Sequence, residues 1–182
     1  MDVNEILEEI TQAMTLRAEP KGVAVQFKDR LSEYCILTDR NRLHQVMTNL
    51  MTNALKFTDG GAITIGYTLQ PDNMLRFYVS DTGCGIPKDK QKDIFTRFIK
   101  LNRFVQGTGL GLPICQTIVE RMGGEIGVDS EVGNGATFWF TVPNRKVKKN
   151  QKSRFSNKNV HIYKKKISQF SLQKIIPAIS SL

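Results

Sequence analysis

The chain has 182 residues, 40% of them hydrophobic, and a formal net charge of +9 at pH 7. This length suits one compact domain with an appendage and leaves little room for two full domains. No apolar run approaches the roughly 20 residues that a membrane span requires, and the acidic, amphipathic start resembles neither a signal peptide nor a transit peptide. Cys35, Cys84 and Cys115 form no C-x-x-C pair, so we expect a reduced, cytoplasmic protein.

The positive charge is confined to the end of the sequence. Residues 1–143 contain 15 Lys and Arg against 17 Asp and Glu, a net charge of −2, whereas residues 144–182 contain 11 Lys and Arg and no acid. This asymmetry predicts a domain over 1–143 and a basic tail over 144–182. The tail's composition favours disorder or a non-native extension over an arm that binds nucleic acid or an anionic membrane. A weak amphipathic pattern over 167–176 could also dock on the domain.

Apolar periodicity and turn residues predict the elements in chain order. The first helix starts at residue 3 and ends before Pro20. Short strands are expected at 23–27 and 35–37, then a long helix at 40–57. A hairpin follows with strands near 63–67 and 75–79, then a short helix at 90–95, a helix at 110–122 and two strands on either side of 131–135. This mixed order predicts an α+β two-layer sandwich.

Three polar residues of the long helix form a stripe beside its apolar face. Asn49, Asn53 and Lys56 follow one another at helical spacing. Any one asparagine is most simply a structural residue with a satisfied amide. Two asparagines and a lysine on one stripe instead favour oxygen ligands for Mg²⁺ together with a cation for phosphate.

A glycine-rich segment, Asp81-Thr82-Gly83-Cys84-Gly85-Ile86-Pro87, directly follows a predicted strand. Glycine at positions 83 and 85 lets the backbone approach a flat ligand closely. Asp81, at the end of the strand, could accept a hydrogen bond from an exocyclic amine. A tight turn without a ligand explains this segment equally well.

A second glycine-rich segment, Gly107-Thr108-Gly109-Leu110-Gly111-Leu112, leads into a helix. Backbone N–H groups at a helix start attract phosphate. The G-x-G-x-G spacing differs from the dinucleotide-binding pattern, and no P-loop pattern occurs in the chain.

The order and the amino-acid sequences of these segments resemble the catalytic domain of sensor histidine kinases. That domain belongs to the ATPase superfamily that includes DNA gyrase, mismatch-repair and heat-shock chaperone ATPases. RLHQVMTNLMTNALKFT resembles the N box, DTGCGIP the first glycine box, IFTRF the phenylalanine box, GTGLGLPI the second glycine box and GNGATFWFTVP the closing strand. The resemblance implies a Bergerat-type fold, a mixed five-stranded sheet with helices on one face. It also implies that nucleotide lies between the helices and a mobile lid.

The resemblance implies a role for each matching residue. Asn53 is expected to bind Mg²⁺ with Asn49 as its polar partner, and Lys56 to reach phosphate. Asp81 is expected to accept from the adenine amino group. The other expected ATP-binding residues are Gly83, Gly85, Gly107, Gly109, Leu110, Gly111 and Thr137. Phe95 and Phe98 are expected at the lid base, with plain core packing as most of their role. The lid cations Arg97, Lys100 and Arg103 are left out of the site because a solvated loop explains them as well.

Two features depart from the family pattern. Residues 99–106 form a short lid, which predicts modest nucleotide affinity. Neither His44 nor His161 lies in a sequence like H-E-x-[RK]-[TN]-P, the phosphoacceptor pattern of the family. We therefore expect a catalytic domain that is a monomer in isolation and needs a histidine from another domain.

The leading functional hypothesis is an ATP-dependent protein-histidine kinase domain of a two-component system, with a histidine-bearing dimerisation domain and a response regulator as partners. The alternative is a nucleotide-binding regulatory module without phosphotransfer, similar to an anti-sigma factor or a kinase relic. The superfamily's hydrolases place a glutamate four residues before the Mg²⁺ asparagine, and here that position is Asn49. This difference argues against rapid hydrolysis of ATP by water.

Overall fold

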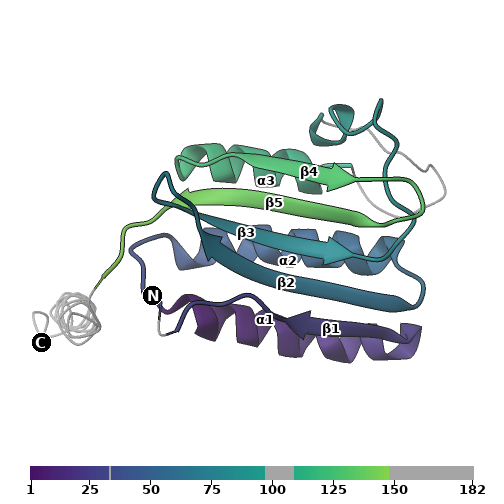
Figure 1. Ribbon diagram of the computed structural model, residues 1–182, viewed down its shortest axis with the longest axis horizontal. Coiled ribbons are helices and arrows are strands. Elements are labelled where there is room, and N and C mark those ends of the chain that lie inside the picture. The colour runs from purple at the N-terminus through teal and green to yellow at the C-terminus, as the bar shows by residue number, and fades with distance from the viewer. Residues whose placement is uncertain (33, 97–108, 148–182) are drawn as a thin grey trace, which may run out of the picture. The chain divides into compact units, whose positions relative to one another are not determined.

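The computed structural model describes residues 1–32, 34–96 and 109–147. Five strands form one sheet in the order β1-β2-β3-β5-β4 (Figure 1). β1 (Val23–Phe27) is parallel to β2 (Gly61–Leu69), and β3 (Met74–Asp81), β5 (Ala136–Pro143) and β4 (Ile126–Ser130) continue the sheet with antiparallel pairing. The expected mixed five-stranded sheet is confirmed.

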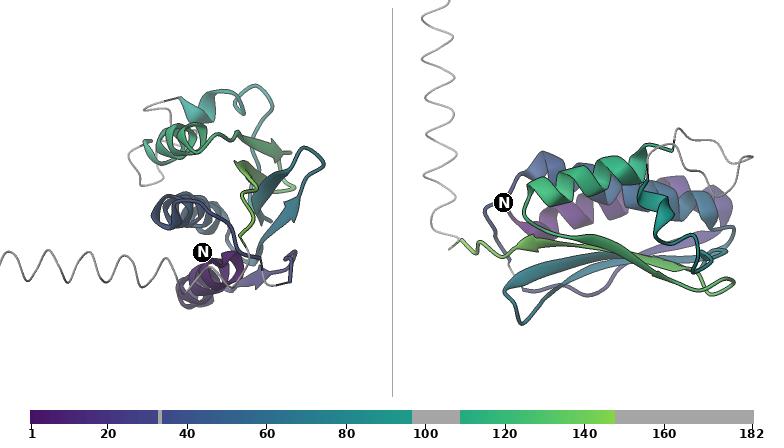
Figure 2. Two further views of the ribbon diagram at one scale, coloured as in Figure 1. Left: turned by 90° about the vertical axis from the view of Figure 1, so that its left-hand side faces the viewer. Right: turned by 90° about the horizontal axis from the view of Figure 1, so that it is seen from above.

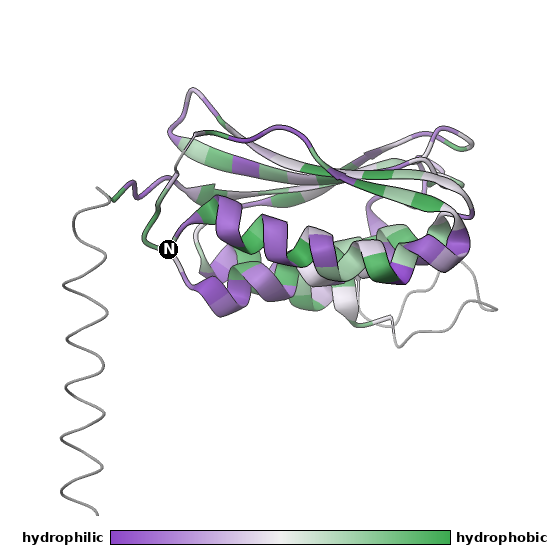
Figure 3. Ribbon diagram, turned by 90° about the horizontal axis from the view of Figure 1, so that it is seen from below, coloured by the Kyte–Doolittle hydropathy of each residue, from purple (hydrophilic) through white to green (hydrophobic). Residues whose placement is uncertain are grey.

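Three helices cover one face of this sheet (Figure 2). They are α1 (Val3–Ala18), α2 (Arg40–Phe57) and α3 (Gly111–Arg121), and α2 packs between the other two. Each has one buried side, and Figure 3 shows hydrophilic and hydrophobic residues along the same helices. No described helix is long and apolar enough to cross a membrane. The two-layer α+β arrangement is therefore as the sequence predicts.

The core lies between the helices and the sheet. Along β3 the buried positions alternate, so Leu75, Phe77 and Val79 face the helices. The Phe77 ring stacks between Tyr67 and Phe140, with ring centroids 5.4 and 5.1 Å away. This aromatic row joins β2, β3 and β5 in the centre of the sheet.

Two predicted elements differ in the structure, the strand at 35–37 and the helix at 90–95. Residues 35–37 form no strand; Cys35 and Ile36 make isolated bridges to Asp2 and Lys146. Each residue pairs with a different segment, so no ladder can extend. The expected helix at 90–95 is a 3₁₀ turn, η2 (Asp93–Phe95), and a second 3₁₀ turn, η1 (Glu19–Lys21), follows α1.

The C-terminal boundary lies close to the end of β5. Leu37 N donates to Arg145 O at 2.9 Å, and Ile36 pairs with Lys146, so backbone pairing continues a little beyond Pro143. The compact unit spans Met1–Lys146. Residues 148–182, nearly all of the expected tail, lie outside the described residues.

The other sheet face, which no helix of the described residues covers, carries a row of aromatic and glycine residues. Gly66, Tyr78, Trp139 and Gly127 are direct neighbours across four strands. A Cβ on Gly66 would lie 2.7 Å from the Tyr78 ring hydroxyl, and one on Gly127 would lie 2.4 Å from the Trp139 ring. The two rings therefore lie over glycines, which leave room for them on the pleated surface.

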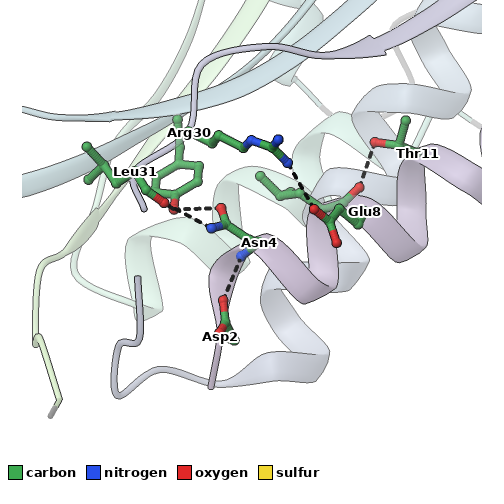
Figure 4. A network of polar contacts seen from close by, with 8 residues as sticks. Asp2, Asn4, Glu8, Thr11, Arg30 and Leu31 are labelled. Carbon is green, nitrogen blue, oxygen red and sulfur yellow. Dashed lines mark hydrogen bonds and ion pairs between the residues drawn. The ribbon is translucent and has the colours of Figure 1, made fainter. Parts of the chain in front are cut away.

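A buried polar network fixes α1 to the segment after β1 (Figure 4). The Asn4 side chain donates to Leu31 O at 2.9 Å and accepts from the Tyr67 hydroxyl at 2.9 Å, and that hydroxyl also lies 3.2 Å from Leu31 O. Asp2 caps the helix by accepting from Asn4 N at 3.1 Å. Burial raises the pKa of Tyr67 to about 12, so its hydroxyl remains a donor at neutral pH.

We predict that Tyr67→Phe lowers the free energy of unfolding by about 1–2 kcal/mol, because the Asn4 amide oxygen loses its buried donor. Urea denaturation measures the change. Tyr34→Phe is the matched control: its hydroxyl has one partner, Asn144 at 3.1 Å, whereas the Tyr67 hydroxyl lies within hydrogen-bond distance of both Asn4 Oδ1 and Leu31 O. An equal loss in both variants would contradict a special role for the Asn4 network.

Candidate nucleotide-binding site

Helix α2 carries the polar stripe of the candidate site and is capped at both ends. The Asp39 carboxylate accepts from the backbone N–H groups of Asn41 and Arg42 at 3.0 and 3.1 Å. At the other end, Lys21 Nζ donates to Leu55 O at 2.9 Å, where a cation also complements the helix dipole. These caps hold the last turns of α2, which contain the stripe, in place.

Asn49, Asn53 and Lys56 lie half-buried on this helix. Asn49 Nδ2 donates to Cys115 Sγ of α3 at 3.5 Å, and its Oδ1 lies 4.0 Å from where a Cβ on Gly111 would be. The structure therefore places Asn49 beside the start of α3. Burial raises the pKa of the Cys115 thiol to about 11, so this contact is with a neutral thiol.

The next two positions of the stripe differ in their contacts. Among the described residues, the Asn53 side chain makes no hydrogen bond, so its amide oxygen is available to a ligand. The Lys56 ammonium lies 5.2 Å from the centre of the Phe57 ring, at the end of the helix. Within the part of the chain that the structure describes, no group of three or more His, Cys, Asp or Glu side chains is placed to hold a metal ion.

Asp81 ends β3 as a buried carboxylate, with 7% of the residue exposed. Its Oδ1 accepts from Gly83 N at 2.9 Å. Burial raises its pKa above the usual carboxyl range, although hydrogen bonds from the backbone of Gly83 and Ala136 oppose that rise. Among the described residues, no ion pair involves Asp81. A ligand that donates a hydrogen bond would relieve part of this desolvation cost.

The loop after Asp81 is packed between the end of α2 and the β4–β5 hairpin. A Cβ on Gly83 would lie 2.3 Å from Phe57 O. Gly85 has φ +71°, and a Cβ there would lie 2.0 Å from Glu131 O. The space that these glycines leave is thus filled by protein backbone, whereas the sequence suggested that it serves ligand approach. The glycines set the shape of the loop that follows the Asp81 carboxylate.

The second glycine segment is described only from Gly109. Gly109 has φ +70°, Leu110 is the N-cap of α3, and Gly111 is its first residue. Because Asn49 Oδ1 lies beside Gly111, the N–H groups at the start of α3 lie next to the polar stripe of α2. The expected lid, residues 99–106, lies outside the described residues, as do Gly107, Phe98 and the three lid cations.

The structure does not bring Thr137 to the same side as Asp81. Asp81 pairs with Ala136 on β5, and Thr137 pairs with Ser80, its hydroxyl 2.8 Å from that of Ser80. Successive residues of a strand point to opposite faces, so Thr137 lies on the sheet face without helices. The alternation of Phe138, Phe140 and Val142 in the sequence already carried this signal.

Sequence analysis did not single out Ser130 and Gln91. Their side chains hold the backbone of the loop at Ile86, within 2.9 Å in each case. Neither residue stands in a motif, and no local spacing connects them to a loop elsewhere in the chain.

The fold and this arrangement define an ATP-binding domain of the two-layer α+β class. Residues 38–146 match the family described as histidine kinase-, DNA gyrase B-, and HSP90-like ATPase, and the chain belongs to that family. Curated relatives include the aerobic respiration control sensor protein ArcB of Escherichia coli, 34% identical over 78% of this chain and 19% of that protein. The adaptive-response sensory kinase SasA of Synechococcus elongatus is 43% identical over 59% of this chain and 29% of its own length. The chain thus spans about a fifth to three tenths of these relatives.

Solved structures agree with this assignment. Full-length ShkA in complex with AMPPNP is 35% identical, with a TM-score of 0.73 over 81% of this chain and 31% of that one. The nucleotide-free catalytic domain of histidine kinase ThkA is 29% identical, with a TM-score of 0.70 over 79% of this chain and 93% of that one. Among these relatives, this chain corresponds to the catalytic domain of sensor histidine kinases.

We predict that Gly85→Ala disrupts the loop, because the added Cβ would meet Glu131 O while the backbone keeps its positive φ. Gly22→Ala is the matched control: Gly22 also has positive φ, +64°, nothing lies within 4 Å of the added Cβ, and its turn follows η1. Calorimetric titration with ATP should show a large loss of affinity for Gly85→Ala and a small one for Gly22→Ala. Equal effects would mean that backbone strain alone, and not the close contact, shapes the loop.

Proposed function

We propose that this domain binds ATP with Mg²⁺ and transfers the γ-phosphoryl group to a histidine on a separate dimerisation domain. The observation that carries the proposal is the buried Asp81 carboxylate, which has no ion-pair partner among the described residues and ends β3 on the sheet face that the helices cover. Membership of the family supports it. A response regulator would then receive the phosphoryl group from the phosphohistidine.

The Asp81 carboxylate is assigned to the adenine base. It accepts a hydrogen bond from the amino group of adenine, whereas guanine presents a carbonyl oxygen at the equivalent position. A carboxylate facing that carbonyl gains no hydrogen bond and meets a like partial charge. The raised pKa of Asp81 fits this role, because a donor from the ligand favours the charged form that burial disfavours.

The phosphates are assigned to the stripe of α2 and to the start of α3. Lys56 supplies a cation, and the N–H groups near Gly109, Leu110 and Gly111 supply donors. The amide oxygen of Asn53, which accepts no hydrogen bond within the described part of the chain, fits Mg²⁺, which prefers hard oxygen ligands and is commonly shared with substrate phosphates. Bound Mg²⁺ would neutralise phosphate charge as it develops during transfer.

Phosphoryl transfer from ATP requires the protein to position the reactants and to neutralise charge, and it requires no covalent intermediate with the protein. Asn49, which contacts Cys115 and the start of α3, orders the region between the two helices. Because residue 49 is an amide, it cannot take a proton from water as a carboxylate can. We therefore assign the acceptor role to an external histidine and expect little hydrolysis.

We further propose that the expected domain over 1–143, together with the paired residues 144–146, carries this activity, that the rest of the tail is a dispensable appendage, and that the domain is a monomer that works in the cytoplasm. The charge separation between the two segments supports this division.

We predict that Asn53→Ala abolishes phosphotransfer and the dependence of ATP binding on Mg²⁺ while the fold survives. Calorimetry with ATP in Mg²⁺ and in EDTA, followed by radiolabel transfer to an added histidine-bearing domain, measures both. Asn41→Ala is the control, since it changes the same residue type about 18 Å away along the same helix. Equal ATP affinity of the wild type in Mg²⁺ and EDTA would remove Asn53 from the metal role. ATP binding without transfer to any supplied histidine would indicate a regulatory module instead.

We predict that wild-type protein prefers ATP to GTP and that Asp81→Asn lowers ATP affinity by about 10- to 150-fold. The same substitution, Asp81→Asn, should not lower the stability of the folded protein at neutral pH. The raised pKa means that the charged carboxylate costs stability once the pH exceeds that pKa, and a neutral amide avoids this cost. Thermal melts should therefore show Asp81→Asn at least as stable as wild type at pH 7, with the gap narrowing in acid. Unchanged ATP affinity would make Asp81 a turn residue only.

A further inference from the structure

Two side chains hold both polar backbone atoms of Ile86, at the end of the first glycine loop. The Ser130 hydroxyl accepts from Ile86 N at 2.9 Å, and Gln91 Nε2 donates to Ile86 O at 2.9 Å. Ile86 is itself buried, with 9% exposed, so its backbone groups have little access to water. Both are satisfied by side chains from other segments, which fixes this point of the loop in space.

The same two residues also bind each other and the β4–β5 hairpin. Ser130 Oγ donates to Gly135 O at 2.6 Å, and Gln91 Nε2 donates to Ser130 O at 2.8 Å. We call Ser130 and Gln91 the loop clamp. The clamp joins the glycine loop, the turn that follows it and the hairpin into one hydrogen-bonded unit.

Gly135, the hairpin residue to which the Ser130 hydroxyl donates, lies against Asp81. Gly135 follows the hairpin tip, and a Cβ on it would lie 1.9 Å from Asp81 O. The next residue, Ala136, pairs with Asp81 across the sheet. The clamp thus acts on both ends of the segment from Asp81 to Ile86. Two backbone hydrogen bonds also hold this segment, from Gly133 N to Cys84 O at 2.9 Å and from Thr82 N to Ala62 O at 3.1 Å, whereas its contact with α2, Cys84 N to Phe57 O, is a long 3.4 Å.

We propose that Ser130 and Gln91 are positioning residues for base recognition, which hold the loop so that the Asp81 carboxylate meets the adenine amino group. This inference rests on the proposed assignment of Asp81 to adenine. A hydroxyl suits the position because it donates to Gly135 O and accepts from Ile86 N at once. In Ser130→Ala, Gly135 O and Ile86 N would lose this side-chain partner, and the loop would be held less firmly.

The inference predicts a loss of base discrimination and not a general loss of binding. Ser130→Ala and Gln91→Ala should each lower ATP affinity by about tenfold, because small misplacements of a positioned group are costly. GTP gains no hydrogen bond from Asp81, so its affinity should change little. The ATP-to-GTP ratio therefore falls, whereas a merely structural loss would lower both affinities together. Ser130→Thr keeps the hydroxyl and should restore the ratio.

The test is a set of calorimetric titrations with ATP and GTP, in Mg²⁺, on the full chain and these variants, with thermal melts. Thr141→Val is the matched control. The Thr141 hydroxyl also accepts from a backbone N–H, that of Glu125 at 2.9 Å, but lies at the other end of β5, about 17 Å from Ala136. Hydrogen exchange should show faster exchange over 82–87 in the clamp variants and unchanged exchange there in Thr141→Val.

The outcomes separate the two proposals. If wild type prefers ATP and both clamp variants keep that preference, the clamp has no positioning role, and the assignment of Asp81 stands. If wild type binds ATP and GTP equally, the assignment of Asp81 fails and the clamp inference fails with it. If Ser130→Ala does not fold, Gln91→Ala decides the matter, since Gln91 is half-buried and lies outside the sheet.

Discussion

The burial of one carboxylate, that of Asp81, constrains the rest of the site. A buried carboxylate without an opposite charge is costly, and only hydrogen bonds offset that cost in the free protein. The Gly83 and Ala136 backbones supply them, which requires both the glycine loop and β5 to lie close to the end of β3. The close packing around Gly85 and Gly135 follows from this requirement. The buried Asp81 carboxylate thus lowers the stability of the folded protein, and it is available to a ligand that donates a hydrogen bond.

Helix α2 connects this end of the sheet to the phosphate side of the site. It packs between α1 and α3, and its caps at Asp39 and Lys21 fix its ends. Its apolar side packs against the sheet. Asn49 of its polar stripe contacts α3 through the Cys115 thiol, and Asn53 lies one turn further along α2.

The two faces of the sheet carry different residues and have different surroundings. The helical face holds the core and ends at Asp81, and the other face carries the row of Gly66, Tyr78, Trp139 and Gly127. The Arg76 guanidinium lies 4.5 Å from the centre of the Trp139 ring, so part of this second face is covered by the sheet's own side chains. Thr137 belongs to this second face, and the structure gives it a partner in Ser80.

The helices, the five strands of the sheet and a set of candidate site residues could be predicted from the sequence alone. Helix 40–57 was predicted to the residue, because its cap and its period of 3.6 are local signals. Asp81 and the glycines that follow it stand in a contiguous motif, so they were identified before any contact was known. Only the tertiary structure decided that those glycines accommodate Phe57 and Glu131, and that Ser130 and Gln91 hold the loop. Those contacts join residues that lie far apart in the chain, and no local periodicity or spacing encodes which distant backbone atoms will meet.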